Sequence, residues 1–310
     1  MTDRETGKRR GTAMNNRIIW IVPVFFALFL FGGGFLVIAL ETLPLPYDKL
    51  SGSMYFIISY YVIPFLPLFL LALLILAGIK KNRFIFAKLL PSYKGNKFKK
   101  FLAGLAIGFL MNTVCVTAAV IHQDIRLSYD FSLTEIPFMV FAFICICLQS
   151  STEEIWCRGF LQERINIHYS FPAAAIVSSL AFGLLHAFNP GITPLALVNL
   201  ILTGISYSLA YRVTDSLWVP AGIHTAWNFT QNLVFGLPNS GLVSETSVFR
   251  LEAAAGTRNL VYDPLFGVEG AVPCMAVTVM LGVLCIYRAH VQDSTGEWLL
   301  SYEAQRRETI

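Results

Sequence analysis

Long apolar segments constrain this 310-residue chain more than any other feature. A helix needs about 20 mostly apolar residues to cross the hydrocarbon core of a bilayer, where backbone polar groups find no water. Runs that qualify lie near residues 18–40, 54–79, 101–121, 135–152, 171–188, 194–211, 217–236 and 270–287. Only 14% of the residues are charged, against about 25% in soluble domains. The sequence therefore predicts an all-α, polytopic membrane helix bundle of about eight transmembrane helices.

The basic residues predict the orientation of this bundle. Lys and Arg are retained on the cytoplasmic side of membrane proteins. The loop from Lys80 to Lys100 carries eight basic residues and no acidic one, and the N-terminal tail is also basic. If both regions are inside, only four of the 23 Lys and Arg lie outside: Lys49, Arg126, Arg250 and Arg258. We therefore expect a multi-pass protein of the cell membrane with both termini in the cytoplasm. The net charge of +4 reflects this bias, so the expected partner is the lipid bilayer and not nucleic acid.

The distribution of polar residues divides the chain into three parts. Residues 1–134 combine the N-terminal tail with three apolar helices that contain no buried charge, which is typical of a scaffold. Residues 135–236 hold the helices with unusual polar residues. Residues 237–310 comprise an external loop, the last transmembrane helix and a cytoplasmic tail. The six cysteines lie in or beside apolar runs, so we interpret them as small core residues and not as disulfides or metal ligands.

Three short clusters place ionisable side chains within the second part. They are Glu153-Glu154…Arg158, Phe182…His186 and His224…Asn228. Ionisable groups in membrane segments are costly and are functional candidates by default, although a solvated interfacial Glu or an interhelical hydrogen-bonding His is the structural alternative. In each of the second and third clusters the two residues lie one helical turn apart, and so do Glu154 and Arg158, which can form an ion pair. Glu153 then points about 100° away from Glu154, towards another helix.

Residue spacing predicts that Glu153 and His186 meet. The chain is expected to reverse near Ser170, and the two residues lie at similar distances before and after that turn. In an antiparallel helical hairpin, equal distances from the turn mean equal depth. Hydropathy instead places Glu153 near the inner face and His186 near the outer one, unless the fourth helix continues past Arg158. We give the hairpin register more weight. The depth of His224 in its span is consistent with a site partly open to the cytoplasmic side.

Taken in order, the three clusters resemble the signatures of the CAAX-processing and bacteriocin-processing (CPBP, or ABI) family of glutamic-type intramembrane proteases, which includes type II CAAX prenyl endopeptidases. The family pattern is Glu-Glu-x-x-x-Arg, Phe-x-x-x-His and His-x-x-x-Asn on three helices, and this chain matches all three over about residues 130–235. The resemblance implies hydrolysis of peptide bonds within the membrane. The implied substrates are membrane-bound or lipidated peptides and proteins.

The resemblance also implies a role for each motif residue. Glu153 would be the general base for a water molecule, aided by His186, while His224 and Asn228 would stabilise the oxyanion. Glu154 and Arg158 would support the site. We favour a metal-free mechanism without a cofactor. The alternative is a metalloprotease in which His186, His224 and either Glu153 or Glu154 hold zinc.

Two non-proteolytic functions stay open at this point. A membrane scaffold or peptide-immunity protein of the same family could bind a peptide in the same pocket without cleaving it. A proton-coupled transporter could use Glu153 and the histidines as a relay. Such transporters commonly contain inverted repeats, and the sequence shows no internal repeat.

Overall fold

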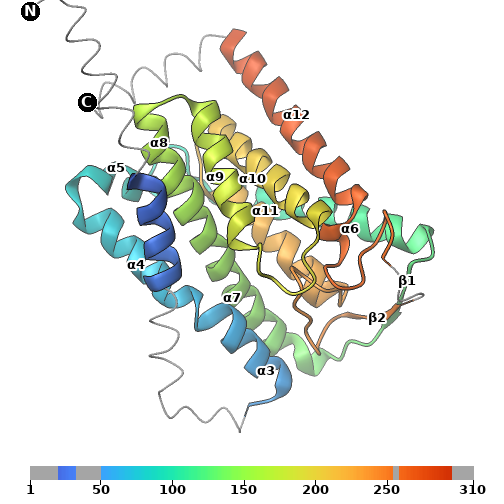
Figure 1. The fold of residues 1–310 in the computed structure, drawn as a ribbon. Coiled ribbons are helices and arrows are strands. Elements are labelled where there is room, and N and C mark those ends of the chain that lie inside the picture. Colours follow the sequence, from blue (N-terminus) through green and yellow to red (C-terminus); the bar gives the residue numbers. More distant parts are fainter. Residues whose placement is uncertain (1–19, 33–49, 254–257, 295–310) are drawn as a thin grey trace, which may run out of the picture.

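The protein is a helical bundle, seen here in a computed structural model that describes residues 20–32, 50–253 and 258–294 (Figure 1). The α-helices from the second apolar run onward are α3 (Gly52–Ile57), α4 (Phe65–Gly78), α5 (Arg83–Ala87), α6 (Phe98–Ile121), α7 (Ile136–Glu154), α8 (Glu163–His168), α9 (Phe171–Leu185), α10 (Pro194–Thr214), α11 (Trp218–Phe229) and α12 (Val272–Ser294). Segments of π-helix cover Ala27–Gly32, Ile58–Val62, Ile155–Gln162 and Thr230–Val234. The six cysteines are all free, as expected.

Five helical segments are long and apolar enough to cross a membrane, which confirms the predicted helical membrane bundle. They are Gly52–Gly78, Phe98–Ile121, Leu133–His168, Pro194–Thr214 and Val272–Gln292. Two further apolar helices, Trp20–Leu30 and Phe171–Leu185, are shorter. These seven segments and α11 (Trp218–Phe229) place helix in each of the eight predicted runs, and the count of eight membrane crossings stays a prediction.

The predicted bounds of the fourth helix, 135–152, were wrong. The helix runs without interruption from Leu133 to His168, through α7, a π-helical segment and α8. Hydropathy ended it too early because it treats polar side chains as exposed, whereas Glu154 and Arg158 are buried and paired with each other. The longer helix removes the conflict between hydropathy and hairpin register over the relative depths of Glu153 and His186. The chain reverses at Ser170, whose side chain caps α9, and the hairpin register holds.

Small residues bring α6 and α11 into close contact. A Cβ atom at Gly104 would overlap the carbonyl oxygen of Val219, and one at Gly108 would overlap that of Ile223. Such glycine pairs, four residues apart, let membrane helices approach at backbone distance. Because α11 carries the third motif, this contact fixes the position of His224 relative to the rest of the bundle.

We expect Gly108→Ala to destabilise the protein by about 1–3 kcal/mol, because the added methyl group overpacks a backbone contact. The matched control is Gly78→Ala, since a Cβ atom there meets nothing within 4 Å. Thermal unfolding of both variants in detergent measures the difference. Equal unfolding temperatures for the two variants would contradict the close contact between α6 and α11.

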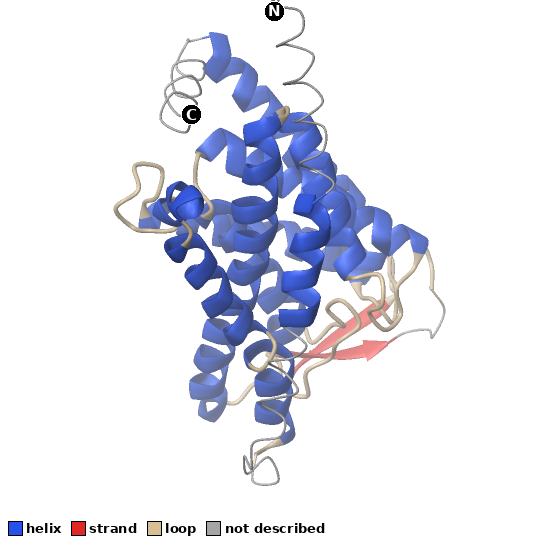
Figure 2. Cartoon of the chain, turned by 60° about the vertical axis from the view of Figure 1, so that its left-hand side comes forward, coloured by secondary structure: helices blue, strands red, loops and turns tan. Residues whose placement is uncertain are grey.

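The two ends of the bundle differ in structure. At one end β1 (Ile125–Tyr129) pairs antiparallel with β2 (Phe249–Ala253), joining the connections that precede α7 and α12 (Figure 2). At the other end the α5 region is held against α8, where Lys88 Nζ lies 3.0 Å from Glu163 Oε1. The two connections that contain β1 and β2, both predicted to be external, therefore share one end, away from the Lys80–Lys100 loop, while Lys49 lies outside the described residues. The membrane side that each end faces stays a prediction.

Candidate active site

Glu153 lies near the end of α7 and is 5% exposed. Its Oε1 accepts a hydrogen bond of 2.7 Å from Gln149 Nε2, one turn earlier on the same helix. Its Oε2 is buried and has no hydrogen-bond partner among the described residues. Since an unpaired buried polar atom costs free energy, Oε2 marks a position where the site accommodates a water molecule or a ligand.

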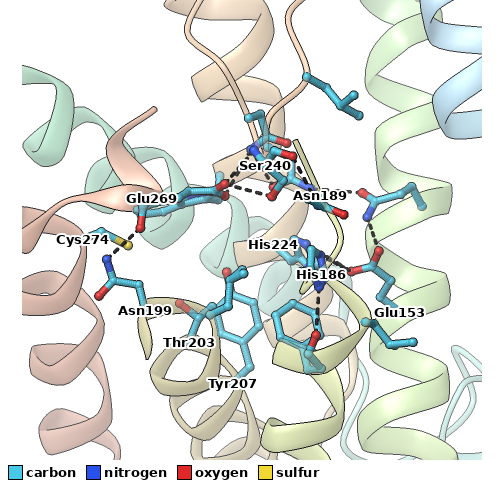
Figure 3. Close-up of a pocket in the computed structure, with 18 of the residues that line it drawn as sticks. Glu153, His186, Asn189, Asn199, Thr203, Tyr207, His224, Ser240, Glu269 and Cys274 are labelled. Atoms are coloured by element: carbon cyan, nitrogen blue, oxygen red, sulfur yellow. Dashed lines mark hydrogen bonds and ion pairs between the residues drawn. The ribbon is translucent and has the colours of Figure 1, made fainter. Parts of the chain in front are cut away.

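Two histidines from different helices face this oxygen (Figure 3). Nε2 of His186, directly after α9, lies 4.0 Å from Glu153 Oε2, and Nε2 of His224, on α11, lies 3.8 Å from it. His186 Nδ1 donates to the carbonyl oxygen of Phe182 at 2.8 Å, and His224 Nδ1 donates to Glu154 Oε1 at 3.1 Å. In a neutral imidazole, donation from Nδ1 leaves Nε2 with a lone pair. Both rings therefore direct an acceptor nitrogen towards Glu153.

Arg158 connects the first two motifs. Its fully buried guanidinium donates to Glu154 Oε1 at 3.0 Å and to the carbonyl oxygen of Gly204 at 3.1 Å. It also stacks over the ring of Phe182, 4.7 Å from the centroid. The predicted contact between Glu154 and Arg158 is present. Phe182 packs on Arg158 with its ring and orients His186 with its carbonyl group, which gives a physical reason for the spacing of the second motif.

Asn228 belongs to a chain of side-chain amides that begins at Glu153. Its Nδ2 donates to Gln149 Oε1 at 3.0 Å, and its Oδ1 accepts from Asn239 Nδ2 at 3.2 Å. Asn239 Nδ2 also lies 3.3 Å from Glu269 Oε1. One amide hydrogen of Asn228 is therefore committed to Gln149, and the second is left for another partner.

Glu269 is a second buried carboxylate on the same cavity. Its Oε1 accepts from Trp227 Nε1 at 3.0 Å, and its Oε2 accepts from the backbone nitrogen and the hydroxyl group of Ser240, at 2.7 and 2.9 Å. Burial raises the pKa of the Glu269 carboxyl above its usual value, and the hydrogen bonds from Ser240 oppose that shift. Glu269 thereby holds the start of the 237–269 segment against α11.

Three further residues of the site were not predicted from the sequence: Gln149, Asn239 and Glu269. Gln149 could have been found, because it precedes Glu153 by one turn on the same helical face. Glu269 could have been suspected as a lone carboxylate directly before an apolar helix. Asn239 gave no such signal, because it lies in a segment without periodicity.

The predicted catalytic residues Glu153, His186, His224 and Asn228 line one cavity. Its lining also includes Asn189, Ser240 and Leu242, from the connections at the β1–β2 end of the bundle. Where the cavity opens, including the expected opening to the cytoplasmic side, stays a prediction. The depth of His224 alone could not show that the segment after α11 folds back over the site.

The spacing of these side chains bears on whether the site could hold zinc. Among the residues that the structure describes, no three His, Cys, Asp or Glu side chains are arranged to hold a metal ion. Zinc bonds of about 2.0–2.1 Å in a tetrahedral site place ligand atoms roughly 3.3 Å apart, which is shorter than the 3.8 and 4.0 Å found here. The donor types suit zinc, but the spacing better suits a water molecule that hydrogen-bonds to each group.

A comparison with protein families bears on the segment that contains these residues. Residues 133–230 match the family model described as Rce1-like, type II CAAX prenyl endopeptidase. This segment resembles an Rce1-like domain. It extends from the turn before α7 through α11 and contains all three motifs, so the recognition of a CPBP-type intramembrane protease is confirmed. No curated protein and no solved structure matches the chain. The Rce1-like domain supports a CAAX-type intramembrane endopeptidase in general.

Proposed function

We propose that this protein is an intramembrane endopeptidase in which Glu153 activates a water molecule. The observation that carries the proposal is the buried, unpartnered Glu153 Oε2, with two histidine Nε2 atoms at 3.8 and 4.0 Å. These separations leave room for one bridging water. Such a water donates one hydrogen bond to Glu153 Oε2 and the other to His186 Nε2, which orients its lone pair towards a substrate.

The proposed reaction uses Glu153 first as a base and then as an acid. As the water oxygen attacks the carbonyl carbon of the scissile peptide, a water proton moves to Glu153 Oε2 and the carbonyl oxygen becomes negative. When this tetrahedral intermediate collapses, the C–N bond breaks and Glu153 gives the proton to the leaving nitrogen. Positioned acid–base groups of this kind typically accelerate a reaction by about 10²–10⁴-fold.

We assign oxyanion stabilisation to His224 and Asn228. His224 can donate from Nε2 only as the imidazolium, and Glu154, which accepts from His224 Nδ1, lies where it stabilises that cation. Asn228 would supply the amide hydrogen that Gln149 does not use. Arg158 and Glu154 would act by holding these side chains in place and not by touching the substrate.

The proposed substrates are membrane-bound or lipidated peptides and proteins, because the site lies between membrane-type helices and its domain is Rce1-like. The proposed setting is the cell membrane, with both termini in the cytoplasm. We propose a reaction without a cofactor, and zinc held by His186, His224 and a carboxylate is the alternative.

Cleavage of an internally quenched, farnesylated CAAX peptide by the full chain in proteoliposomes tests this function. We expect cleavage by the wild type and a loss of about 10²-fold or more in His186→Ala. His122→Ala is the matched control, since this histidine is exposed and lies at the end of α6, outside the cavity. Equal activity in His186→Ala and wild type would contradict the assigned role. Proton-coupled solute flux without cleavage would support a transporter instead.

The same assay separates the metal-free reaction from the zinc alternative. We expect full activity after exhaustive chelation, with no metal found by elemental analysis. Activity that disappears on chelation and returns with added zinc would show that the histidines serve as ligands.

A further inference from the structure

Three buried polar atoms, on side chains that line the cavity containing Glu153, have no hydrogen-bond partner among the described residues. They are Glu153 Oε2, the hydroxyl oxygen of Tyr61 and Oδ1 of Asn199. Figure 3 shows Asn199 and Glu153 on opposite sides of this cavity, with His186 and His224 between them. Unpaired donors and acceptors gathered around one cavity are what a polar ligand requires. The mechanism above uses only the first of the three.

Tyr61 presents a fixed hydroxyl group at this cavity. The residue is 3% exposed and lies in the π-helical segment Ile58–Val62. Its ring packs edge-on against Phe56, with centroids 5.9 Å apart, and belongs to a cluster that includes residues of α7. Glu153 and Glu269 line the same cavity. A phenol in its ordinary neutral form donates one hydrogen bond, so this hydroxyl is available as a donor.

Asn199, on α10, presents a fixed acceptor. Its Nδ2 donates to the carbonyl oxygens of Glu269 and Ala271, at 2.7 and 2.9 Å. These two bonds use both amide hydrogens, so the amide cannot be turned over without losing them. Oδ1 must therefore point away from these carbonyl groups, and it is the atom without a partner.

We propose that Tyr61 donates a hydrogen bond to the carbonyl oxygen of the scissile peptide and that Asn199 accepts one from a neighbouring substrate N–H. The inference rests on the proposed hydrolysis and names where the substrate backbone binds. His224 can donate from Nε2 only as the imidazolium, whereas a phenol donates in its neutral form, so Tyr61 adds a donor to those assigned to His224 and Asn228. As the carbonyl oxygen becomes negative, the bond from Tyr61 strengthens, so Tyr61 is a catalytic residue.

Tyr61→Phe tests the first half of this proposal. The variant loses one unpartnered oxygen and keeps the packed ring, so we expect an unfolding temperature equal to or above that of the wild type. With the farnesylated CAAX peptide, kcat should fall about 10²–10³-fold, as for other oxyanion donors, with KM nearly unchanged. Tyr262→Phe is the matched control. Its hydroxyl is also buried and unpartnered among the described residues, but Tyr262 does not line the cavity.

The outcomes distinguish this inference from the proposed function. Wild-type kcat in Tyr61→Phe, with Glu153→Gln inactive, would overturn the role of Tyr61 and leave the hydrolase intact. Wild-type activity in both variants would reject the hydrolase itself. Equal losses in Tyr61→Phe and Tyr262→Phe would also overturn the inference, since they would reflect the removal of any buried hydroxyl group.

Ester-substituted substrates test the second half. Replacing one peptide N–H at a time by an ester oxygen removes a donor without adding bulk. We expect one position next to the scissile bond at which this replacement raises KM by about tenfold, the effect of one lost hydrogen bond. That penalty should vanish in Asn199→Ala. A wild-type enzyme that is indifferent to every ester position would overturn the assignment of Asn199.

Discussion

Replacing Glu153 with glutamine is expected to abolish peptide hydrolysis while leaving the fold intact. Glutamine has the same shape and can still accept the hydrogen bond from Gln149, but it cannot take a proton from water. The substitution replaces a buried carboxylate by a neutral amide of the same size, so we expect no loss of thermal stability. The rate should fall by about 10³-fold or more, within the range for loss of a general base.

Single-turnover cleavage of the farnesylated CAAX peptide measures this effect, and thermal unfolding reports on the fold. Glu252→Gln is the matched control, because this residue is exposed on β2. If Glu153→Gln cleaves the peptide at the wild-type rate, Glu153 is not the base. If it is inactive and also unfolded, Glu153→Asp replaces it, since a shorter carboxylate keeps the charge while moving it away from the water.

Replacing Arg158 with methionine is expected to cause the largest loss of stability in the chain. Arg158 is completely buried and pairs with Glu154, whose other oxygen already has no partner among the described residues. Removing one member of a buried ion pair leaves an uncompensated charge, at a cost of about 3–5 kcal/mol. Unfolding by denaturant in mixed micelles measures the difference.

A second substitution separates the charge effect from a loss of packing. In Glu154→Gln/Arg158→Met no unpaired charge is left, so we expect the double variant to regain most of the lost stability. It should stay inactive, because His224 loses its carboxylate partner. Arg126→Met, at an exposed position on β1, is the control. If the double variant is as unstable as Arg158→Met, the loss comes from packing against Phe182 and not from charge.

The sequence predicted that Glu153 and His186 meet across the α7–α9 hairpin, because this contact depends only on the helical rise per residue and the position of one turn. Each residue adds the same rise to a helix, so Glu153 and His186 are level if they are equally far from the turn. The ion pair between Glu154 and Arg158 follows from helical spacing in the same way. These contacts are local or involve one turn of the chain, so counting residues is sufficient.

The rest of the site depends on packing between distant segments. Asn239 and Glu269 reach the cavity because the segment after α11 folds back over it, and no periodic pattern encodes that path. Tyr61 comes from the N-terminal helices, outside the residues that match the Rce1-like domain. The length of the fourth helix was underestimated for a related reason. Whether Arg158 ends a helix depends on the partners that it finds in three dimensions.

The side-chain amides of Gln149, Asn228 and Asn239 all point the same way. Each donates towards Glu153, and Gln149 and Asn228 each accept from the next amide, so the dipoles are aligned with their positive ends towards the carboxylate. Such an array has a polarity, and no single member can turn over without breaking the bonds on both sides. The array ends at Asn239, so the orientation of the amides next to Glu153 depends on the position of the 237–242 segment. If that segment lifts to admit a peptide, Asn228 loses the donor on its far side and is held in orientation by Gln149 alone.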